Sequence, residues 1–251
     1  MTQHTAARSQ PDMIEFEARV ATLRQTHPDS RIQSFEFAGH KYWLKQPERL
    51  AGAMKLLKDD PRRALQTEIQ VLTGLAGKGA PVPRVMLSGD DFFVVEDAGK
   101  TVSSWLHASK SDSSVPFMDV LNDSAKALAD LHALGLSHGR PALRDIGWQQ
   151  GNVKFIDFEA AQQSRPLRYQ QQRDLLVYLH SLYRYMGTEH AQIDAAIASY
   201  RRSGGEQNWL ETQQRMRRWQ WLRPLLKPLR NIGGKDLKPV YWVLWHFQRH
   251  R

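Results

Sequence analysis

The segment from residue 128 to 159, LADLHALGLSHGRPALRDIGWQQGNVKFIDFE, concentrates side chains that can do chemistry. Asp157 ends an apolar run, VKFI, and Asp145 lies in the loop before the same predicted hairpin, so the two carboxylates can approach one another. The chain has no cysteine. Paired carboxylates without thiolates or clustered histidines suit a hard cation such as Mg²⁺, with Mn²⁺ as the alternative. The acids predict a divalent metal site, although an aspartate at a strand end is also a common turn or cap residue.

A second candidate pair lies in the first third of the chain. Lys45 ends the predicted strand HKYWLK. Glu68 follows Leu65 by three residues and precedes Leu72 by four, so it borders the apolar stripe of a predicted helix. A carboxylate at the edge of a buried face usually has a cationic partner. The pair would orient a lysine toward nucleotide phosphates. The alternative for Lys45 is an edge-strand lysine whose alkyl chain lies along apolar surface.

The patterns around Lys45 and Glu68 predict the elements that hold them. Residues 1–97 are expected to form a small, strand-rich lobe. Its elements are predicted helices over 12–26 and 61–76 and β-hairpins over 31–45 and 85–96, the first of which turns at Ala38-Gly39.

The two aspartates fall in a second, larger part, residues 98–251, which is predicted to be mostly helical. Residues 97–104 are interpreted as the connection into this part and 109–116 as a polar loop. The predicted elements are helices over 119–134 and 173–186, a short hairpin formed by IGWQ and VKFID around Gln150-Gly151, and further helices to the end of the chain. The fold class expected for the whole chain is α+β.

The order of these motifs resembles the protein-kinase-like fold. Within that fold, the chain is most similar to the bacterial lipopolysaccharide core kinases, the Kdo and heptose kinase group. The resemblance covers residues 41–186 and rests on YWLK, Glu68, VVEDAG, LADLHALGLSHGRPALRD, IDFE and Arg173-Asp174. It implies a two-lobed protein-kinase-like fold, with a small β-rich N-lobe and a larger, mostly helical C-lobe.

The resemblance also implies a nucleotide site. Lys45 would contact the α- and β-phosphates of ATP, and Glu68 would pair with Lys45. Backbone atoms from Glu96 to Ala98 would hold the adenine. One feature departs from the family: the chain has no glycine-rich phosphate loop, because Gly39 is the only glycine between residues 1 and 51.

In the catalytic segment the resemblance implies that Asp157 binds Mg²⁺ and that Asp174 braces the catalytic loop by accepting backbone N–H bonds. His138-Gly139-Arg140 matches the usual triplet, but Arg140 replaces the catalytic acid, and Asp145 stands where a metal-binding asparagine is usual. Arginine cannot accept a proton at working pH.

Three interpretations of this replacement remain open. Asp145 is both metal ligand and base, or the acceptor needs no strong base, or no transfer occurs. A loose transition state favours the second, because the acceptor oxygen is barely deprotonated when the phosphoryl group moves. Arg140 would then stabilise phosphate charge or bind an anionic acceptor.

The charge of the chain favours an anionic partner. Lys and Arg outnumber Asp and Glu by 35 to 26, which gives a formal charge of +9. Basic residues alternate with tryptophans in the final third, at Trp219, Trp221, Trp242 and Trp245. Such a pattern suits an anionic membrane surface or single-stranded nucleic acid. The interpretation with slightly more weight is that these tryptophans are core residues of the large lobe.

Together these features predict an ATP-dependent kinase that uses ATP and Mg²⁺ and phosphorylates a sugar of lipopolysaccharide core or a similar anionic saccharide or lipid-linked acceptor. The alternative is a pseudokinase, which binds a nucleotide or a partner without transfer. Nucleic acid is disfavoured as a partner, because Asp157 and Glu68 would then have no role. The sequence shows neither a secretory h-region nor an apolar run of about 18 residues. We therefore expect a cytoplasmic protein with peripheral contact to the inner membrane.

Overall fold

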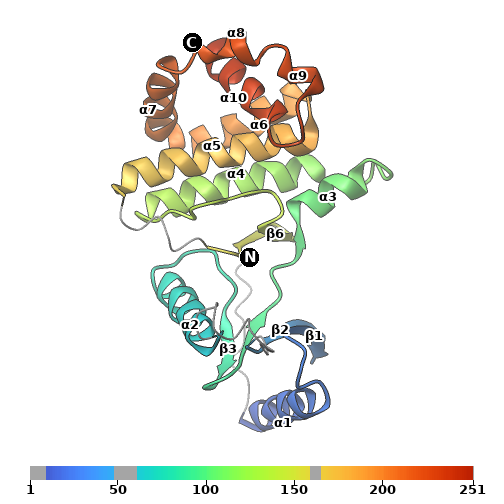
Figure 1. Cartoon of the computed structure of the whole chain (residues 1–251). Coiled ribbons are helices and arrows are strands. Elements are labelled where there is room, and N and C mark those ends of the chain that lie inside the picture. Colours follow the sequence, from blue (N-terminus) through green and yellow to red (C-terminus); the bar gives the residue numbers. More distant parts are fainter. Residues whose placement is uncertain (1–9, 48–60, 159–164, 251) are drawn as a thin grey trace, which may run out of the picture. The chain divides into compact units, whose positions relative to one another are not determined.

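The structure, a computed structural model of the whole chain, describes residues 10–47, 61–158 and 165–250 (Figure 1). The chain divides into two compact units. The first comprises Met1–Gly77 and Pro83–Asp97, and the second comprises Lys78–Val82 and Ala98–Arg251. The first unit contains a small antiparallel sheet and the second is mostly helical, which confirms the α+β class.

The sheet of the first unit consists of β1 (Ile32–Phe37), β2 (His40–Lys45), β4 (Phe93–Glu96) and β3 (Val85–Ser88), in that spatial order. Every neighbouring pair is antiparallel, so both predicted hairpins are confirmed. The first turns at Ala38 (φ 48°) and Gly39 (φ 73°). Positive φ at both residues is what a two-residue hairpin needs to match the twist of its strands.

The sheet packs on α1 (Gln10–Thr26), and α2 (Pro61–Gly77) lies between β2 and β3 along the chain, so both predicted helices are present. Phe16 of α1 joins Tyr42 and Leu44 of β2 in a buried cluster. Because side chains alternate along a strand, Lys45 projects from the opposite face of the sheet. Strand β2 lies between β1 and β4. The interpretation of Lys45 as an edge-strand lysine is therefore wrong.

The second unit begins with a smaller sheet in the order β5 (Lys100–Thr101), β6 (Ile146–Gln149) and β7 (Asn152–Phe155). The β6–β7 hairpin turns at Gln150-Gly151, as predicted, with φ values of 50° and 82°. Strand β7 ends at Phe155, so the predicted strand extends too far and Asp157 lies in the segment that follows.

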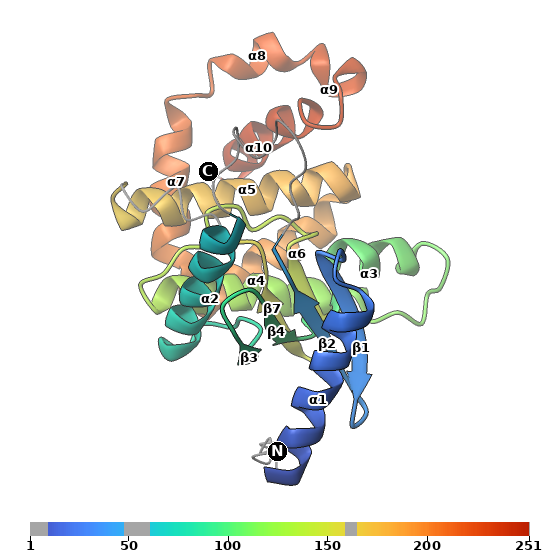
Figure 2. The same ribbon diagram turned by 60° about the horizontal axis from the view of Figure 1, so that its bottom comes forward.

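Helices form the rest of the second unit: α3 (Val102–Ser109), α4 (Phe117–Ala133), α5 (Leu167–Met186), α6 (His190–Tyr200), a π-helical segment (Arg201–Gly205), α7 (Glu206–Arg217), α8 (Leu222–Leu226), α9 (Leu229–Ile232) and α10 (Lys238–Arg249). Helices α4 and α5 lie side by side, joined by a buried hydrogen bond of 2.8 Å between Ser124 Oγ and Tyr178 Oη (Figures 1 and 2). Helix α10 packs against α5, α7, α8 and α9. This arrangement buries one continuous face of α4 and α5 as the core of the unit.

Two predicted segments need correction. The sequence predicts a connection over residues 97–104, but Thr101 caps a helix that starts at Val102, since its hydroxyl accepts the Ser104 N–H at 3.3 Å. Helix α5 begins at Leu167 rather than at 173. Asp174 therefore lies inside the helix instead of opening it.

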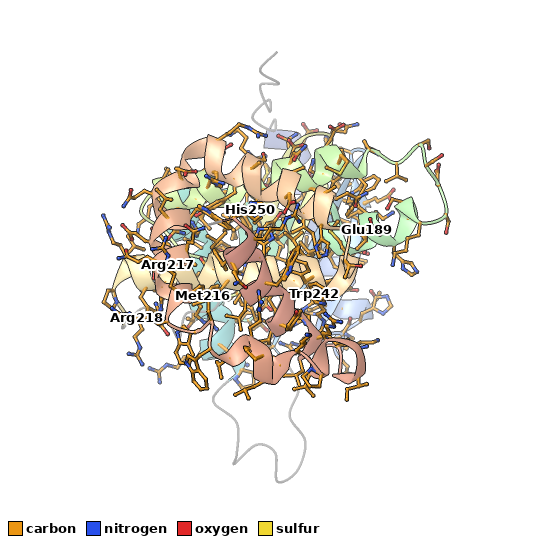
Figure 3. All side chains as sticks on the ribbon, turned by 90° about the horizontal axis from the view of Figure 1, so that it is seen from above. Glu189, Met216, Arg217, Arg218, Trp242 and His250 are labelled. Atoms are coloured by element: carbon orange, nitrogen blue, oxygen red, sulfur yellow. The ribbon has the colours of Figure 1, made fainter. Side chains whose placement is uncertain are left out.

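The tryptophans of the final third do not share one environment. Trp219 and Trp221 are 47% and 62% exposed, whereas Trp242 and Trp245 are half-buried on α10. The core interpretation is therefore wrong for the first two. Figure 3 shows the neighbouring Arg217 and Arg218 at the periphery of this group of helices. Among the described helices, none combines the length and the apolar character that crossing a bilayer requires.

Candidate functional site

A buried aspartate fixes the loop that carries Arg140. The side chain of Asp174 is completely buried, and its two oxygens accept the backbone N–H groups of His138 at 2.6 Å and Gly139 at 2.8 Å. The neighbouring Arg173 donates to the carbonyl of Gly139. The bracing role expected of Asp174 is confirmed. An ionised acceptor strengthens such hydrogen bonds, so the loop is held in one conformation.

His138 joins this loop to the segment after β7. Its Nε2 lies 3.0 Å from the carbonyl of Ile156, and its Nδ1 lies 3.2 Å from the backbone N–H of Arg140. A carbonyl only accepts and an amide only donates, so Nε2 carries the proton and Nδ1 accepts: the ring is neutral. Its ring stacks on Phe158 with 4.4 Å between centroids. His138 therefore has a packing role in this structure.

Acidification is expected to destabilise the fold through His138. Burial lowers the pKa of His138 below its ordinary value of 6.5. The unfolded chain then binds a proton that the folded chain does not, so this contribution is complete above pH 6.5 and is lost as pH falls below it. Urea unfolding between pH 7.5 and 5.5 measures how steeply the free energy of unfolding changes with pH. One proton contributes at most ~1.4 kcal/mol per pH unit to this slope. His138→Asn should flatten the slope, and the exposed-site control His107→Asn should leave it unchanged.

The two predicted metal-binding acids meet at one guanidinium. Arg140 Nη2 lies 2.7 Å from Asp157 Oδ2 and 3.9 Å from Asp145 Oδ2. Arg144 Nε lies 3.5 Å from Asp145 Oδ1. All four residues belong to the second unit. The structure therefore brings together the three residues expected to act in catalysis, Arg140, Asp145 and Asp157, and adds Arg144.

The two carboxylates differ in environment. Asp145 is 6% exposed, and burial raises its pKa against the opposing effect of Arg140 and Arg144. Its Oδ2 accepts no hydrogen bond from the residues that the structure describes. Asp157, by contrast, has a side chain that is 62% exposed. A buried carboxylate oxygen without a hydrogen bond, near a second carboxylate, fits the oxygen ligands that Mg²⁺ prefers.

Asp157 also adopts an uncommon backbone conformation, with φ of 63°. Left-handed values are unfavourable for residues other than glycine, although aspartate tolerates them better than most. Such strain persists only where surrounding contacts require it, and it concentrates at functional sites. The carbonyl of the preceding Ile156 accepts a hydrogen bond from His138, and the Ile156 N–H donates to the backbone carbonyl of Asp145 at 2.9 Å. Glu159, the last residue of the IDFE motif, lies outside the described residues.

In the first unit the predicted ion pair is present. Lys45 Nζ donates to Glu68 Oε1, joining β2 to α2 across 23 residues of sequence. The ammonium also lies 5.4 Å from the centroid of the Phe93 ring. The side chains of Lys45 and Glu68 are 28% and 44% exposed. The lysine is thus oriented by a carboxylate while solvent or a ligand can still reach it.

The residues expected to hold adenine span the point along the chain where the first unit ends, at Asp97, and the second continues, at Ala98. Glu96 ends β4, where its N–H donates to the Arg84 carbonyl at 3.1 Å and its carboxylate accepts the Arg84 N–H at 2.8 Å. Ala98 begins the second stretch of the second unit. A Cβ at Gly147 would lie 2.1 Å from the carbonyl oxygen of Ala98, so only glycine allows β6 to approach this segment so closely.

Sequence reasoning gave no role to Arg144, although it directly precedes Asp145. It also missed a cluster formed by Asp194, His246 and His250. The signal for the two histidines is their spacing of four residues in the helical pattern near the end of the chain. That spacing places both on one face of a helix.

Comparison with known proteins gives one informative relationship. No family model matches the chain. An uncharacterised protein of Haemophilus influenzae is 39% identical over 227 residues, which span 90% of this chain and 93% of that protein. Identity at this level over nearly the full length of both chains shows a common fold and ancestry. The chain therefore belongs to the same protein family as this Haemophilus influenzae protein.

Proposed function

We propose that the protein is an ATP-dependent phosphotransferase with a two-lobed protein-kinase-like fold, and that its acceptor is a hydroxyl of an anionic saccharide or lipid-linked sugar, such as one in lipopolysaccharide core. One observation carries the proposal: Asp145 and Asp157 converge on Arg140, beside a loop that the buried Asp174 braces. Phosphoryl transfer depends on positioned charges more than on covalent chemistry, and this cluster supplies them.

Each residue of the cluster has a distinct proposed role. Asp145 and Asp157 would hold Mg²⁺, which when bound would neutralise charge on the transferring phosphoryl group. Asp145 would also accept the proton of the acceptor hydroxyl, because a carboxylate with a raised pKa is a better base than an ordinary one. Arg140 would bind phosphate or acceptor oxygens through its planar guanidinium.

The ion pair of Lys45 and Glu68 supports the same proposal independently. A lysine on an interior strand, held by a helix carboxylate and still partly exposed, is suited to bind the phosphates of ATP. Backbone groups between Glu96 and Ala98 are proposed to bind the adenine. The two-residue turn at Ala38-Gly39 leaves the phosphate contacts to side chains such as Lys45.

A pseudokinase is the second candidate, and a specific contact favours it. Arg140 lies 2.7 Å from Asp157, so the carboxylate that Mg²⁺ would need is already neutralised by a side chain. Arginine stays protonated at any pH that the protein experiences. In this case the protein would bind nucleotide or a partner, and Arg140 would stand in for the missing metal charge.

ATP binding is expected to depend on Lys45. Lys45→Met removes the ammonium while keeping an unbranched apolar chain, so affinity for ATP should fall by at least about tenfold, ~1.4 kcal/mol. Titration of the full chain with a fluorescent ATP analogue in the presence of Mg²⁺ measures the change. The control is Lys126→Met, which removes an equal charge from an exposed pair with Asp130 on α4. Equal affinity for ATP in the two variants would show that Lys45 does not bind ATP.

Transfer separates the two candidate functions. The full chain is incubated with labelled ATP, Mg²⁺ and total lipopolysaccharide, and label in the saccharide is counted. Labelled acceptor supports the phosphotransferase. ATP binding without label in the saccharide, in other glycolipids or in the protein supports the pseudokinase. A wild-type chain that does not bind ATP at all contradicts the phosphotransferase and the nucleotide-binding form of the pseudokinase.

We propose that the acceptor lies at an anionic membrane and that the protein binds the surface of this membrane. Trp221, Leu225 and Ile232 are 62%, 64% and 79% exposed. Exposed basic residues accompany them, namely Arg217, Arg218, Lys227 and Lys235. Exposed indole rings and arginines close in sequence suit the headgroup region of anionic lipid.

Vesicle binding tests this surface. The full chain should co-sediment with vesicles of phosphatidylglycerol and phosphatidylethanolamine. Less protein should co-sediment as salt rises to 1 M, where the Debye length is only about 3 Å. Trp219→Ala with Trp221→Ala should weaken binding several-fold at any salt concentration, because apolar insertion is lost. The double variant Arg62→Ala and Arg63→Ala removes two exposed arginines from α2, away from this segment of the chain, and should bind like wild type. Binding that is insensitive to both salt and tryptophan would contradict the proposal.

A further inference from the structure

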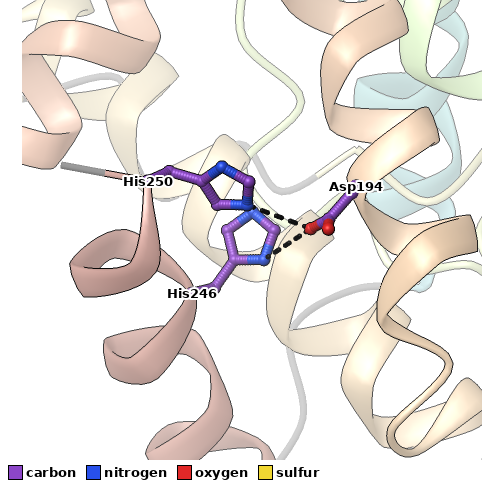
Figure 4. A group of neighbouring side chains, drawn as sticks. All are labelled: Asp194, His246 and His250. Atoms are coloured by element: carbon purple, nitrogen blue, oxygen red, sulfur yellow. Dashed lines mark hydrogen bonds and ion pairs between the residues drawn. The ribbon is translucent and has the colours of Figure 1, made fainter.

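A cluster of three potential metal ligands lies in the helical unit, among residues to which the proposed phosphotransferase assigns no role. Asp194 comes from α6, His246 from α10 and His250 from the end of the same helix, and the three side chains point toward one another (Figure 4). One donor atom from each lies within 4.8 Å of the other two. The cluster therefore joins two helices that are separated by the 37 residues from 201 to 237.

The two histidines converge on a single carboxylate oxygen. His250 Nε2 lies 3.0 Å and His246 Nδ1 lies 3.6 Å from Asp194 Oδ1. The other oxygen, Oδ2, is held by Arg249 at 2.9 Å. In a tetrahedral zinc site with bonds of about 2.0–2.1 Å, neighbouring ligand atoms lie about 3.3 Å apart. The observed separations lie on either side of that value, and the carboxylate is already arranged to bind through one oxygen.

The surroundings of the histidines favour metal binding over a simple surface contact. His246 is completely buried, and the nitrogen that faces Asp194 is Nδ1. The hydroxyl of Tyr183 lies 2.9 Å from His246 Nδ1 and 3.5 Å from His190 Nδ1. It can therefore turn toward His190 and leave His246 Nδ1 free to bind a cation.

We propose that Asp194, His246 and His250 bind one Zn²⁺ ion that fastens α10 to α6. Two imidazole nitrogens and one carboxylate oxygen form a donor set that Zn²⁺ accepts readily and that Mg²⁺ does not prefer. The spacing of His246 and His250 by four residues places both rings on one face of the helix. Three protein ligands leave a fourth position for water. The ion stabilises the C-terminal helix, and the proposal is independent of the one for ATP.

Zinc titration of the chelator-treated full chain tests the site. We expect one Zn²⁺ per chain and a melting temperature that rises when Zn²⁺ is added, because an ion that binds only the folded state stabilises it. Asp194→Asn and His250→Gln should each weaken binding at least tenfold and reduce the rise in melting temperature. Both residues are partly exposed, so these variants are expected to fold even if His246→Gln does not.

Two controls separate this site from adventitious binding. His107→Gln removes an exposed histidine of α3 and should leave both stoichiometry and affinity unchanged. Asp157→Ala, in the proposed ATP site, should also leave Zn²⁺ binding unchanged, so failure of the phosphotransferase proposal does not decide this one. A wild-type chain that binds no stoichiometric Zn²⁺, or an Asp194→Asn/His250→Gln double variant that binds it as tightly as wild type, overturns the proposal.

Discussion

Replacing Asp157 by alanine is expected to lower phosphoryl transfer by at least about a thousandfold, ~4 kcal/mol in the barrier. The variant removes one of the two carboxylates proposed to hold Mg²⁺. Because the Asp157 side chain is 62% exposed but its φ of 63° suits alanine less well than aspartate, the variant should lower the free energy of unfolding by on the order of 1 kcal/mol. Initial rates of transfer from labelled ATP, together with urea unfolding of the same preparation, separate a chemical effect from a structural one.

Asp145 provides the matched comparison. Asp145→Ala is expected to lower transfer at least about tenfold, ~1.4 kcal/mol. Asp145→Asn keeps the shape and an oxygen that can bind metal but cannot act as a base. Full activity in Asp145→Asn would contradict the proposed base role of Asp145 while leaving its metal role intact. Full activity in Asp157→Ala would contradict the proposed metal site as a whole.

Replacing Asp174 by alanine is expected to lower the free energy of unfolding by about 3–5 kcal/mol. The change leaves the backbone N–H groups of His138 and Gly139 buried without their acceptor, and it removes the carboxylate 3.4 Å from His132 Nε2. Urea unfolding monitored by far-UV circular dichroism measures the loss.

Two variants sharpen the result for Asp174. Asp174→Asn retains one carbonyl acceptor and the side-chain volume, so its loss should be smaller but still above ~1 kcal/mol. Asp130→Ala removes an exposed aspartate paired with Lys126 on α4 and should cost less than ~1 kcal/mol. If Asp174→Ala were no more destabilising than Asp130→Ala, the two backbone hydrogen bonds would not be what holds the loop.

Much of the fold follows from local patterns in the sequence. Helices α2 and α4 were predictable because their apolar residues recur at helical spacing, and the β1–β2 hairpin because two short β-rich runs flank Ala38-Gly39. Helix α3 escaped prediction because it buries only Val102 and Leu106. Two buried residues are too few to establish a period.

The candidate site was predictable in composition but not in contacts. The order of the motifs along the chain identified Asp145, Asp157 and Asp174. The ion pair of Lys45 with Glu68 was predictable because Glu68 borders the apolar stripe of its helix. The contact of Arg140 with Asp157 depends on the path of the loop after β7, which no local period encodes. The meeting of Asp194 with His246 likewise depends on how α6 and α10 pack, so the sequence contains no local sign of it.

Arg173 and Asp174 are neighbours on α5, and between them they hold both polar backbone groups of Gly139. The loop that carries Arg140 is thus mechanically part of a long helix, and it cannot swing without breaking these contacts. A ligand that reaches Asp157 therefore needs only the Arg140 side chain to turn. Side-chain rotation takes picoseconds to nanoseconds, whereas loop motion takes up to microseconds. Access to this carboxylate should be governed by the opening of one ion pair and not by a gate made of backbone.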